Sequence, residues 1–214
     1  MKQNFHEIVN IPTGQVFLEG ELTIPAEARS IVIFCHGSGS SRFSTRNKAV
    51  ALNLQQHQFG TLLFDLLTQE EDEASYAMRF DIDLLASRLV GVTEWLSTSQ
   101  QFDSYALGYF GASTGAAAAL KAASQLPYVQ AVVSRGGRPD LAGESLVHVS
   151  TPTLLIVGSL DLEVLALNRD ALNLLNGPKK LLVITGAGHL FEEGDTLSQV
   201  SKAALEWFKQ YLIN

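Results

Sequence analysis

Short apolar runs alternate along most of the chain with longer segments in which apolar residues recur at helical spacing. The short runs are rich in β-branched and aromatic residues, as expected of strands buried on both faces of a parallel sheet. Six runs are predicted as such strands: Ser30–Cys35, Thr61–Asp65, Tyr105–Phe110, Val129–Val133, Thr153–Val157 and Lys180–Ile184. The predicted helices are Asn47–His57, Ala77–Ser97, Thr114–Gln125, Glu163–Leu175 and Ser198–Leu212. This alternation predicts a three-layer α/β/α sandwich around a mostly parallel, doubly wound sheet.

The N-terminal segment has a different pattern. His6–Ile11 and Gln15–Ile24 alternate more strictly between apolar and polar residues, and Pro12-Thr-Gly14 between them is a turn signal. We therefore expect an antiparallel hairpin at one edge of the sheet. The chain has 214 residues and no internal repeat or low-complexity linker, which predicts one domain over residues 1–214.

Composition excludes several classes of partner. Lys and Arg total 15 against 22 Asp and Glu, and a net charge of -7 gives no reason to expect a nucleic acid. The first residues lack the basic start and apolar run of a signal peptide, and no later stretch offers the roughly 20 apolar residues that span a bilayer. We expect a cytoplasmic protein without a membrane partner. The lone cysteine, Cys35, ends an apolar run and is predicted to be buried.

The segment Gly111-Ala-Ser-Thr-Gly115 is the strongest chemical signal in the sequence. It follows the predicted strand ending at Phe110 and precedes the helix-forming run Ala116–Leu120. In this strand–turn–helix context, Gly-x-Ser-x-Gly predicts a nucleophile elbow: Ser113 has a strained backbone, and its neighbours are small so that strand and helix can approach. The helix start would then favour negative charge on a substrate oxygen.

Other interpretations of this glycine-rich turn are weaker. The strand before this turn is not the first of the parallel strands, and the glycines are not spaced as Gly-x-Gly-x-x-Gly. A dinucleotide-binding loop is therefore disfavoured. No Gly-Lys dipeptide occurs, which disfavours a phosphate-binding loop. A turn kept only for packing remains the bland alternative.

A serine hydroxyl needs a base, and the base needs a carboxylate that fixes its tautomer. His189 follows the last predicted strand in a glycine-flanked loop, and Asp161 follows the strand Thr153–Val157. Both therefore lie at the carboxyl ends of the parallel strands, as Ser113 does. The order serine, acid, histidine is that of α/β-hydrolases. Asp161 could instead cap the following helix, in which case Glu163 is the fallback acid; Asp140 and Asp195 are less well placed.

Acyl transfer also needs backbone N–H groups that stabilise the oxyanion. We assign these to Thr114, which follows the nucleophile, and to Ser38 in the Gly- and Ser-rich loop after the first parallel strand. His36 in that loop is predicted to brace it rather than to take part in the chemistry.

The whole chain resembles the α/β-hydrolase superfamily, and within it the small dienelactone-hydrolase-like branch. The motifs that carry the resemblance are His36-Gly-Ser-Gly39, Gly111-Ala-Ser-Thr-Gly115, Gly158-Ser-Leu-Asp161 and Gly188-His189. The resemblance implies a Ser–Asp–His hydrolase with neither a metal nor an organic cofactor. Dienelactone hydrolases proper use a cysteine nucleophile, so the serine here means that the dienelactone substrate does not carry over.

The expected substrate is a small carboxylic ester, cleaved through an acyl-enzyme. Only about 20 residues separate Val133 from Thr153, so a large lid is excluded and the site should be open. A cluster of arginines after two strands would favour an anionic substrate group; its members are Arg42, Arg46, Arg135 and Arg138. Thioester or amide hydrolysis, acyl transfer and a non-catalytic binding role remain open alternatives, and the sequence does not indicate an oligomeric state.

Overall fold

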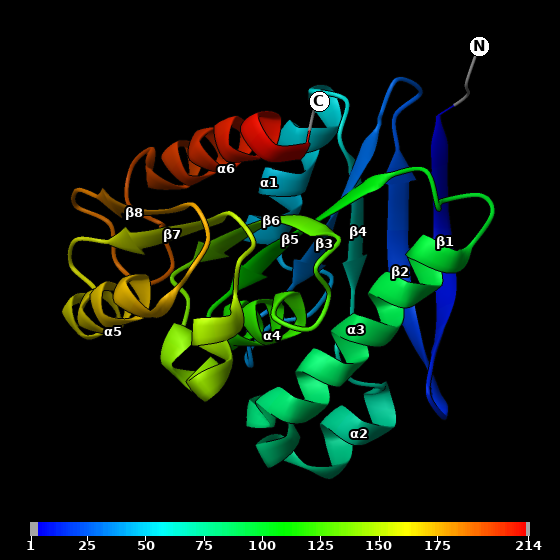
Figure 1. The fold of residues 1–214 in the computed structure, drawn as a ribbon, viewed down its shortest axis with the longest axis horizontal. Helices are drawn as coiled ribbons and strands as arrows, with labels where there is room; N and C mark the ends of the chain where they lie inside the picture. Colours follow the sequence, from blue (N-terminus) through cyan, green and yellow to red (C-terminus); the bar gives the residue numbers. More distant parts are fainter. Residues whose placement is uncertain (1–3, 213–214) are drawn as a thin grey trace.

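A single eight-stranded sheet forms the centre of the molecule (Figure 1). The computed structural model describes residues 4–212. Along the sheet the strand order is β1-β2-β4-β3-β5-β6-β7-β8. The strands are β1 (Phe5–Thr13), β2 (Val16–Ile24), β3 (Ser30–Cys35), β4 (Gly60–Phe64), β5 (Ala106–Ala112), β6 (Val129–Arg135), β7 (Thr153–Gly158) and β8 (Lys179–Ile184).

The predicted hairpin and parallel sheet are both present. Strands β1 and β2 pair antiparallel at one edge, and β2 joins the sheet antiparallel to β4. The remaining pairs, from β4 through β3 to β8, are all parallel. The interior strands β3, β4 and β7 are buried at every position, as the uninterrupted apolar runs predicted.

Helices cover both faces of the sheet and complete the three layers. The helices are α1 (Thr45–Gln56), α2 (Gln69–Ala74), α3 (Ile82–Thr98), α4 (Thr114–Ala123), α5 (Leu162–Leu174) and α6 (Thr196–Leu212), with 3₁₀ segments at Tyr76–Phe80 and Pro139–His148. One apolar core lies under α3 and α4, and a second lies under α1 and α6. The predicted α/β/α fold is confirmed.

One predicted helix begins at a different residue. The sequence pattern placed a helix over Ala77–Ser97, but α3 begins at Ile82, after two shorter pieces of helix. Local capping explains the breaks. The Asp81 side chain accepts a hydrogen bond from Leu84 N, and Thr68 forms a capping box with Glu71 at the start of α2. The Asp81 cap starts a new helix inside the predicted segment, whereas α2 lies before that segment and was not predicted.

Candidate active site

The tight turn between strand and helix that was predicted at Ser113 is present between β5 and α4. Ser113 has φ 50° and ψ -121°, a conformation that L residues rarely adopt. It is the N-cap residue of α4, yet its side chain makes no capping hydrogen bond. The hydroxyl is therefore not used to terminate the helix.

The two motif glycines allow this turn because any side chain there would collide with backbone. A Cβ atom on Gly111 would lie 2.4 Å from Ala116 Cα, and one on Gly115 would lie 2.3 Å from the Cys35 carbonyl oxygen. The end of β5 thus packs against the start of α4, and the start of α4 packs against the end of β3, with backbone in contact in both cases. Cys35 itself is fully buried, as predicted, and burial raises the pKa of its thiol far above the ordinary range.

Asp161 and His189, which are 28 residues apart, meet in a short hydrogen bond. His189 Nδ1 lies 2.6 Å from Asp161 Oδ2. Asp161 is the N-cap residue of α5, but it makes no side-chain capping bond, so its carboxylate is directed to the imidazole instead. This bond favours the His189 tautomer in which Nδ1 carries the proton and Nε2 can accept one.

Hydrogen bonds between two loops hold this pair in place. Ser159 Oγ accepts from Gly186 N at 2.8 Å, and Leu160 N donates to the Ala187 carbonyl at 3.0 Å. A Cβ on Gly158 would lie 2.2 Å from the Ala187 carbonyl oxygen, so the loops after β7 and β8 are in direct backbone contact. That contact positions Asp161 against the histidine loop.

Ser113 and His189 border the same short segment at the end of β6. Ser113 N donates to the Arg135 carbonyl at 3.2 Å, and a Cβ on Gly136 would lie 3.6 Å from His189 Cε1. Within the described chain, no hydrogen bond of 3.5 Å or less joins the serine hydroxyl to the imidazole. Such catalytic bonds often tighten only when substrate binds. The Ser113–His189 bond therefore stays a prediction.

The loop after β3 lies directly against the elbow. A Cβ on Gly37 would lie 3.0 Å from Ser113 Cβ. His36 Nδ1 donates to the Gly37 carbonyl at 3.0 Å, and His36 Nε2 accepts from Leu66 N at 3.1 Å, so the imidazole braces this loop. Burial lowers the pKa of His36 and outweighs the Gly37 carbonyl and the Asp65 carboxylate, which favour the charged form.

Two adjacent hollows lie beside this loop. The small one is lined by Ser38 and Thr114, the predicted oxyanion residues, and by His36. The larger one has a volume of about 460 Å³, shares His36 and Ser40 with the first, and reaches Phe43. The His189 side chain is 40% exposed, so solvent reaches its imidazole directly.

Three of the four predicted arginines are neutralised by carboxylates. Arg42 pairs with Asp65 and Glu19. Arg46 Nη1 lies 2.6 Å from Glu192 Oε1, and Arg138 Nη2 lies 2.7 Å from Asp140 Oδ2, a hydrogen bond that raises the pKa of Arg138. Arg135 is the exception: it is only 7% exposed, and its Nη2 donates to the amide oxygen of Asn47 at 3.3 Å.

Sequence reasoning missed the residues that close the hollows near Ser38. Asp72 and Arg79 line the small hollow from α2 and the 3₁₀ segment after it, and they pair with each other at 2.6 Å. Asp65 Oδ1 accepts a hydrogen bond from Arg42 N at 2.7 Å. This bond connects the end of β4 to the loop after β3. The only available signal was the position of Asp65 directly after a predicted strand.

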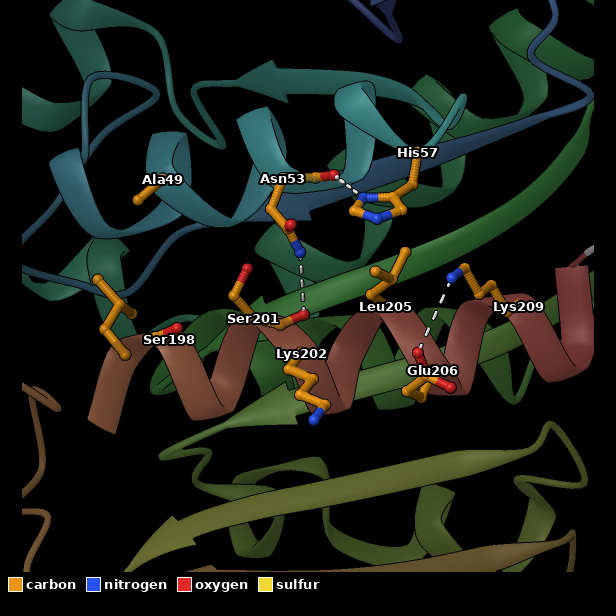
Figure 2. Close-up of a pocket in the computed structure, with 10 residues that line it drawn as sticks. Ala49, Asn53, His57, Ser198, Ser201, Lys202, Leu205, Glu206 and Lys209 are labelled. Atoms are coloured by element: carbon orange, nitrogen blue, oxygen red, sulfur yellow. Dashed lines mark hydrogen bonds and ion pairs between the residues drawn. The ribbon is translucent and has the colours of Figure 1, made fainter. Parts of the chain in front are cut away.

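A separate hollow of about 560 Å³ lies between α1 and α6 (Figure 2). Asn53 Nδ2 donates to the Ser201 carbonyl across it at 3.4 Å, and none of the predicted site residues lines it. Over residues 4–212, no three His, Cys, Asp or Glu side chains are grouped so that they could hold a metal ion. In the same range, none of the helices combines the length and apolar character needed to cross a bilayer.

Comparison with known proteins identifies a relative that matches nearly the whole chain and other solved structures that share its fold. No family model matches the chain. A dienelactone hydrolase from Anabaena variabilis is 55% identical, with a TM-score of 0.95, and the similarity covers 98% of this chain and 99% of that structure. An esterase from Pyrococcus furiosus has a TM-score of 0.78 at 18% identity, covering 98% and 92% of the two chains, which shows a shared fold.

Two curated relatives come from strains of Mycobacterium tuberculosis, and each is named "Putative phosphoribosyl transferase". Each is 56% identical over 207 residues, which are 96% of this chain and 46% of the relative. The chain thus spans about half the length of these curated relatives. Their name refers to proteins about twice as long as the fold described here.

Proposed function

Since the chain belongs to the dienelactone hydrolase family of α/β-hydrolases, we propose that it is a serine hydrolase that cleaves small carboxylic esters. The observation that carries this proposal is the 2.6 Å bond between His189 and Asp161, beside a serine held in a strained turn. The Anabaena variabilis relative is named a dienelactone hydrolase, and other solved structures of this fold are named esterases. The substrate named there is not transferred, because the family's cysteine is replaced by Ser113.

The proposed reaction has two stages. Ser113 Oγ attacks the ester carbonyl carbon while His189 Nε2 accepts its proton, and Asp161 stabilises the resulting imidazolium. The Thr114 and Ser38 N–H groups stabilise the oxyanion. The tetrahedral intermediate collapses, the C–O bond breaks, and His189 returns the proton to the leaving alcohol. Water, deprotonated by His189, then attacks the acyl-enzyme and releases the acid and Ser113.

A fluorophosphonate probe tests the nucleophile directly. We expect one adduct on Ser113 in the wild type, located by peptide mass spectrometry, and none in Ser113→Ala. Hydrolysis of an activated ester should fall by about three or more powers of ten in the same variant, as when a catalytic nucleophile is removed. The matched control is Ser87→Ala, an exposed serine on α3 that bonds only the Leu84 carbonyl.

The result that would contradict the proposal is a folded wild-type protein that takes no adduct, or an Ser113→Ala variant that keeps substantial turnover. Parallel assays with matched ester, thioester and amide substrates, with and without an alcohol acceptor, distinguish ester hydrolysis from the related reactions. We expect the ester to be cleaved fastest and water to be the main acceptor.

A further inference from the structure

The two hollows beside the loop after β3 differ greatly in size. The small one, lined by Ser38 and Thr114, has a volume of about 10 Å³. Such a volume holds about one water molecule, so it suits a single oxygen atom and is too small for an acyl chain. The aromatic hollow, which is lined by Phe17 and Phe43 and shares Ser40 with the small one, has a volume of about 460 Å³. A substrate whose carbonyl oxygen occupies the small hollow therefore finds room for a larger group in the aromatic hollow.

The order of the strands indicates which part of an ester lies there. Asp161 and His189 follow β7 and β8, on one side of β5 and Ser113 (Figure 1). The aromatic hollow lies on the other side, because its lining comes mainly from β2, the loop after β3 and the segment after β4. In the proposed reaction the alcohol leaves beside His189, which returns its proton. The acyl part is therefore directed toward the aromatic hollow.

Two exposed phenylalanines from different elements line this hollow. Phe17 belongs to β2 and is 67% exposed, and Phe43 belongs to the loop after β3 and is 59% exposed. One exposed phenylalanine is ordinary, but two that line the same hollow offer apolar surface that a ligand can cover. Contact between two aromatic rings contributes free energy beyond the burial of area, which favours an aromatic ligand over an aliphatic one.

The Phe43 ring is held in place by anchored cations. The Arg42 guanidinium lies 4.2 Å from the centroid of this ring, and Lys48 Nζ lies 5.3 Å from it. Arg42 is itself bound by Glu19 on β2 and by Asp65 at the end of β4. A ring that is fixed before the ligand arrives binds it with a smaller loss of conformational entropy.

The charges around the aromatic hollow disfavour an anionic ligand. Its lining contains the carboxylates of Glu19, Asp65 and Asp72 and a single guanidinium, that of Arg42. Burial lowers the pKa of His36, which also lines the hollow, so this imidazole adds no positive charge at neutral pH. The excess of carboxylates repels a second carboxylate, whereas their oxygens can accept hydrogen bonds from ring hydroxyl groups.

We propose that the aromatic hollow binds an uncharged aromatic ring in the acyl part of the substrate, in contact with Phe17 and Phe43. This proposal rests on the proposed function and narrows its substrate class to esters of arylalkanoic acids. In these esters a short chain joins the carbonyl carbon to the ring. That chain would pass Ser40, which borders both hollows.

The test compares the methyl esters of 3-phenylpropanoic and 3-cyclohexylpropanoic acid, which share the chain and ring size and differ in aromaticity. Acid release at constant pH gives kcat/KM for each. We expect the wild type to favour the phenyl ester roughly tenfold, mainly through KM. Phe17→Leu and Phe43→Leu should each lower this preference roughly threefold, the effect of one aromatic contact, and the double variant should abolish it.

Tyr128→Leu is the matched control. It removes an exposed aromatic ring that precedes β6, at the opposite end of the parallel strands, and should retain the preference. Absence of a preference in the wild type, or an undiminished preference in the double variant, would overturn the subsite. Fluorophosphonate labelling in the same samples separates the two proposals. A labelled wild type without the preference overturns only the subsite, and a folded wild type without label overturns the proposed function.

A third ester tests the charge of the ring. With a carboxylate at the para position of the phenyl ring, the methyl ester should be cleaved more slowly than its uncharged counterpart, because the carboxylates of the hollow repel it. Faster cleavage of the charged ester would overturn the assignment to an uncharged group.

A binding measurement makes the test independent of turnover. Calorimetry of Ser113→Ala with the phenyl ester should show binding that is weakened roughly threefold by adding Phe17→Leu, and the cyclohexyl ester should bind less tightly than the phenyl ester. Both phenylalanines are exposed, so the variants are expected to fold, and circular dichroism checks this. Equal binding of the two esters to Ser113→Ala would overturn the subsite.

Discussion

At the scale of single residues, the site depends on which ring nitrogen of each imidazole carries a proton. His189 is held in one tautomer by Asp161, and His36 is held in the neutral form by burial and by the Leu66 N–H, from which its Nε2 accepts a hydrogen bond. His36 Nε2 accepts from the Leu66 N–H, and a protonated ring would place a second N–H against that donor. His36 is therefore a structural group whose charge state matters to the loop after β3.

This arrangement predicts a pH dependence of stability. Burial lowers the folded-state pKa of His36, whereas the unfolded chain has the ordinary value of about 6.5. The unfolded state therefore binds a proton first, and the stabilisation that is fully present above about pH 6.5 is lost as the pH falls. From pH 7.5 to 5.5, the free energy of unfolding in urea should drop by about 1 kcal/mol more in the wild type than in His36→Gln.

The control for this measurement is His57→Gln, which alters an exposed histidine at the end of α1. That variant should keep the wild-type slope of stability against pH. Equal slopes for the wild type and His36→Gln would show that the neutral imidazole does not contribute in this way.

At the scale of elements, backbone contact between neighbouring segments positions the three residues proposed to be catalytic, Ser113, Asp161 and His189. The elbow packs on the end of β3 through Gly115, and the loop after β7 packs on the loop after β8 through Gly158. These contacts leave no room for a methyl group. The glycines of the motif are thus packing requirements between elements as much as requirements of the turn.

Gly115→Ala is accordingly expected to destabilise the fold severely. Its Cβ would be placed 2.3 Å from the carbonyl oxygen of Cys35, a backbone atom that cannot move without shifting β3. We expect a loss of at least about 3 kcal/mol in the free energy of unfolding, or insoluble protein, because overpacking against backbone is among the most costly substitutions. Chemical denaturation measures it.

Gly39→Ala serves as the matched substitution, since a Cβ there meets no atom within 4 Å. Its stability should stay within about 0.5 kcal/mol of the wild type. A Gly115→Ala protein with an unchanged denaturation midpoint would refute the packing explanation.

At the scale of the whole molecule, one sheet connects two apolar cores. Trp95 on α3 packs against the core on one face, and Trp207 on α6 belongs to the core on the other. These are the two tryptophans of the chain. Since both cores share the same strands, neither face is expected to unfold alone.

The prediction is one cooperative transition seen equally from both faces. In Trp207→Phe the fluorescence reports the α3 face, and in Trp95→Phe it reports the α6 face. In each variant, the denaturation midpoint from fluorescence should coincide with that from far-UV circular dichroism. Separate midpoints would indicate that the two layers unfold independently.

The sequence by itself was sufficient for the eight strands, the hairpin, the longer helices and the tight turn at Ser113, but not for α2 or the two 3₁₀ segments. Those features arise from local periodicity and from a strand, turn and helix that are adjacent in the chain. The start of α3 was missed because a single capping residue, Asp81, overrides a periodic pattern that continues through it. The contacts of Asp161 could be stated only as alternatives, since a cap and a triad acid occupy the same position.

Only the tertiary structure decided what each charged group contacts. Arg46 and Glu192 are 146 residues apart, and Arg42 meets Asp65 from 23 residues away. No local pattern encodes such pairs, because they depend on how strands from distant parts of the chain are ordered in the sheet. For the same reason, the sequence presented four equivalent arginines, and the fold left one of them, Arg135, buried with no carboxylate of residues 4–212 paired to it.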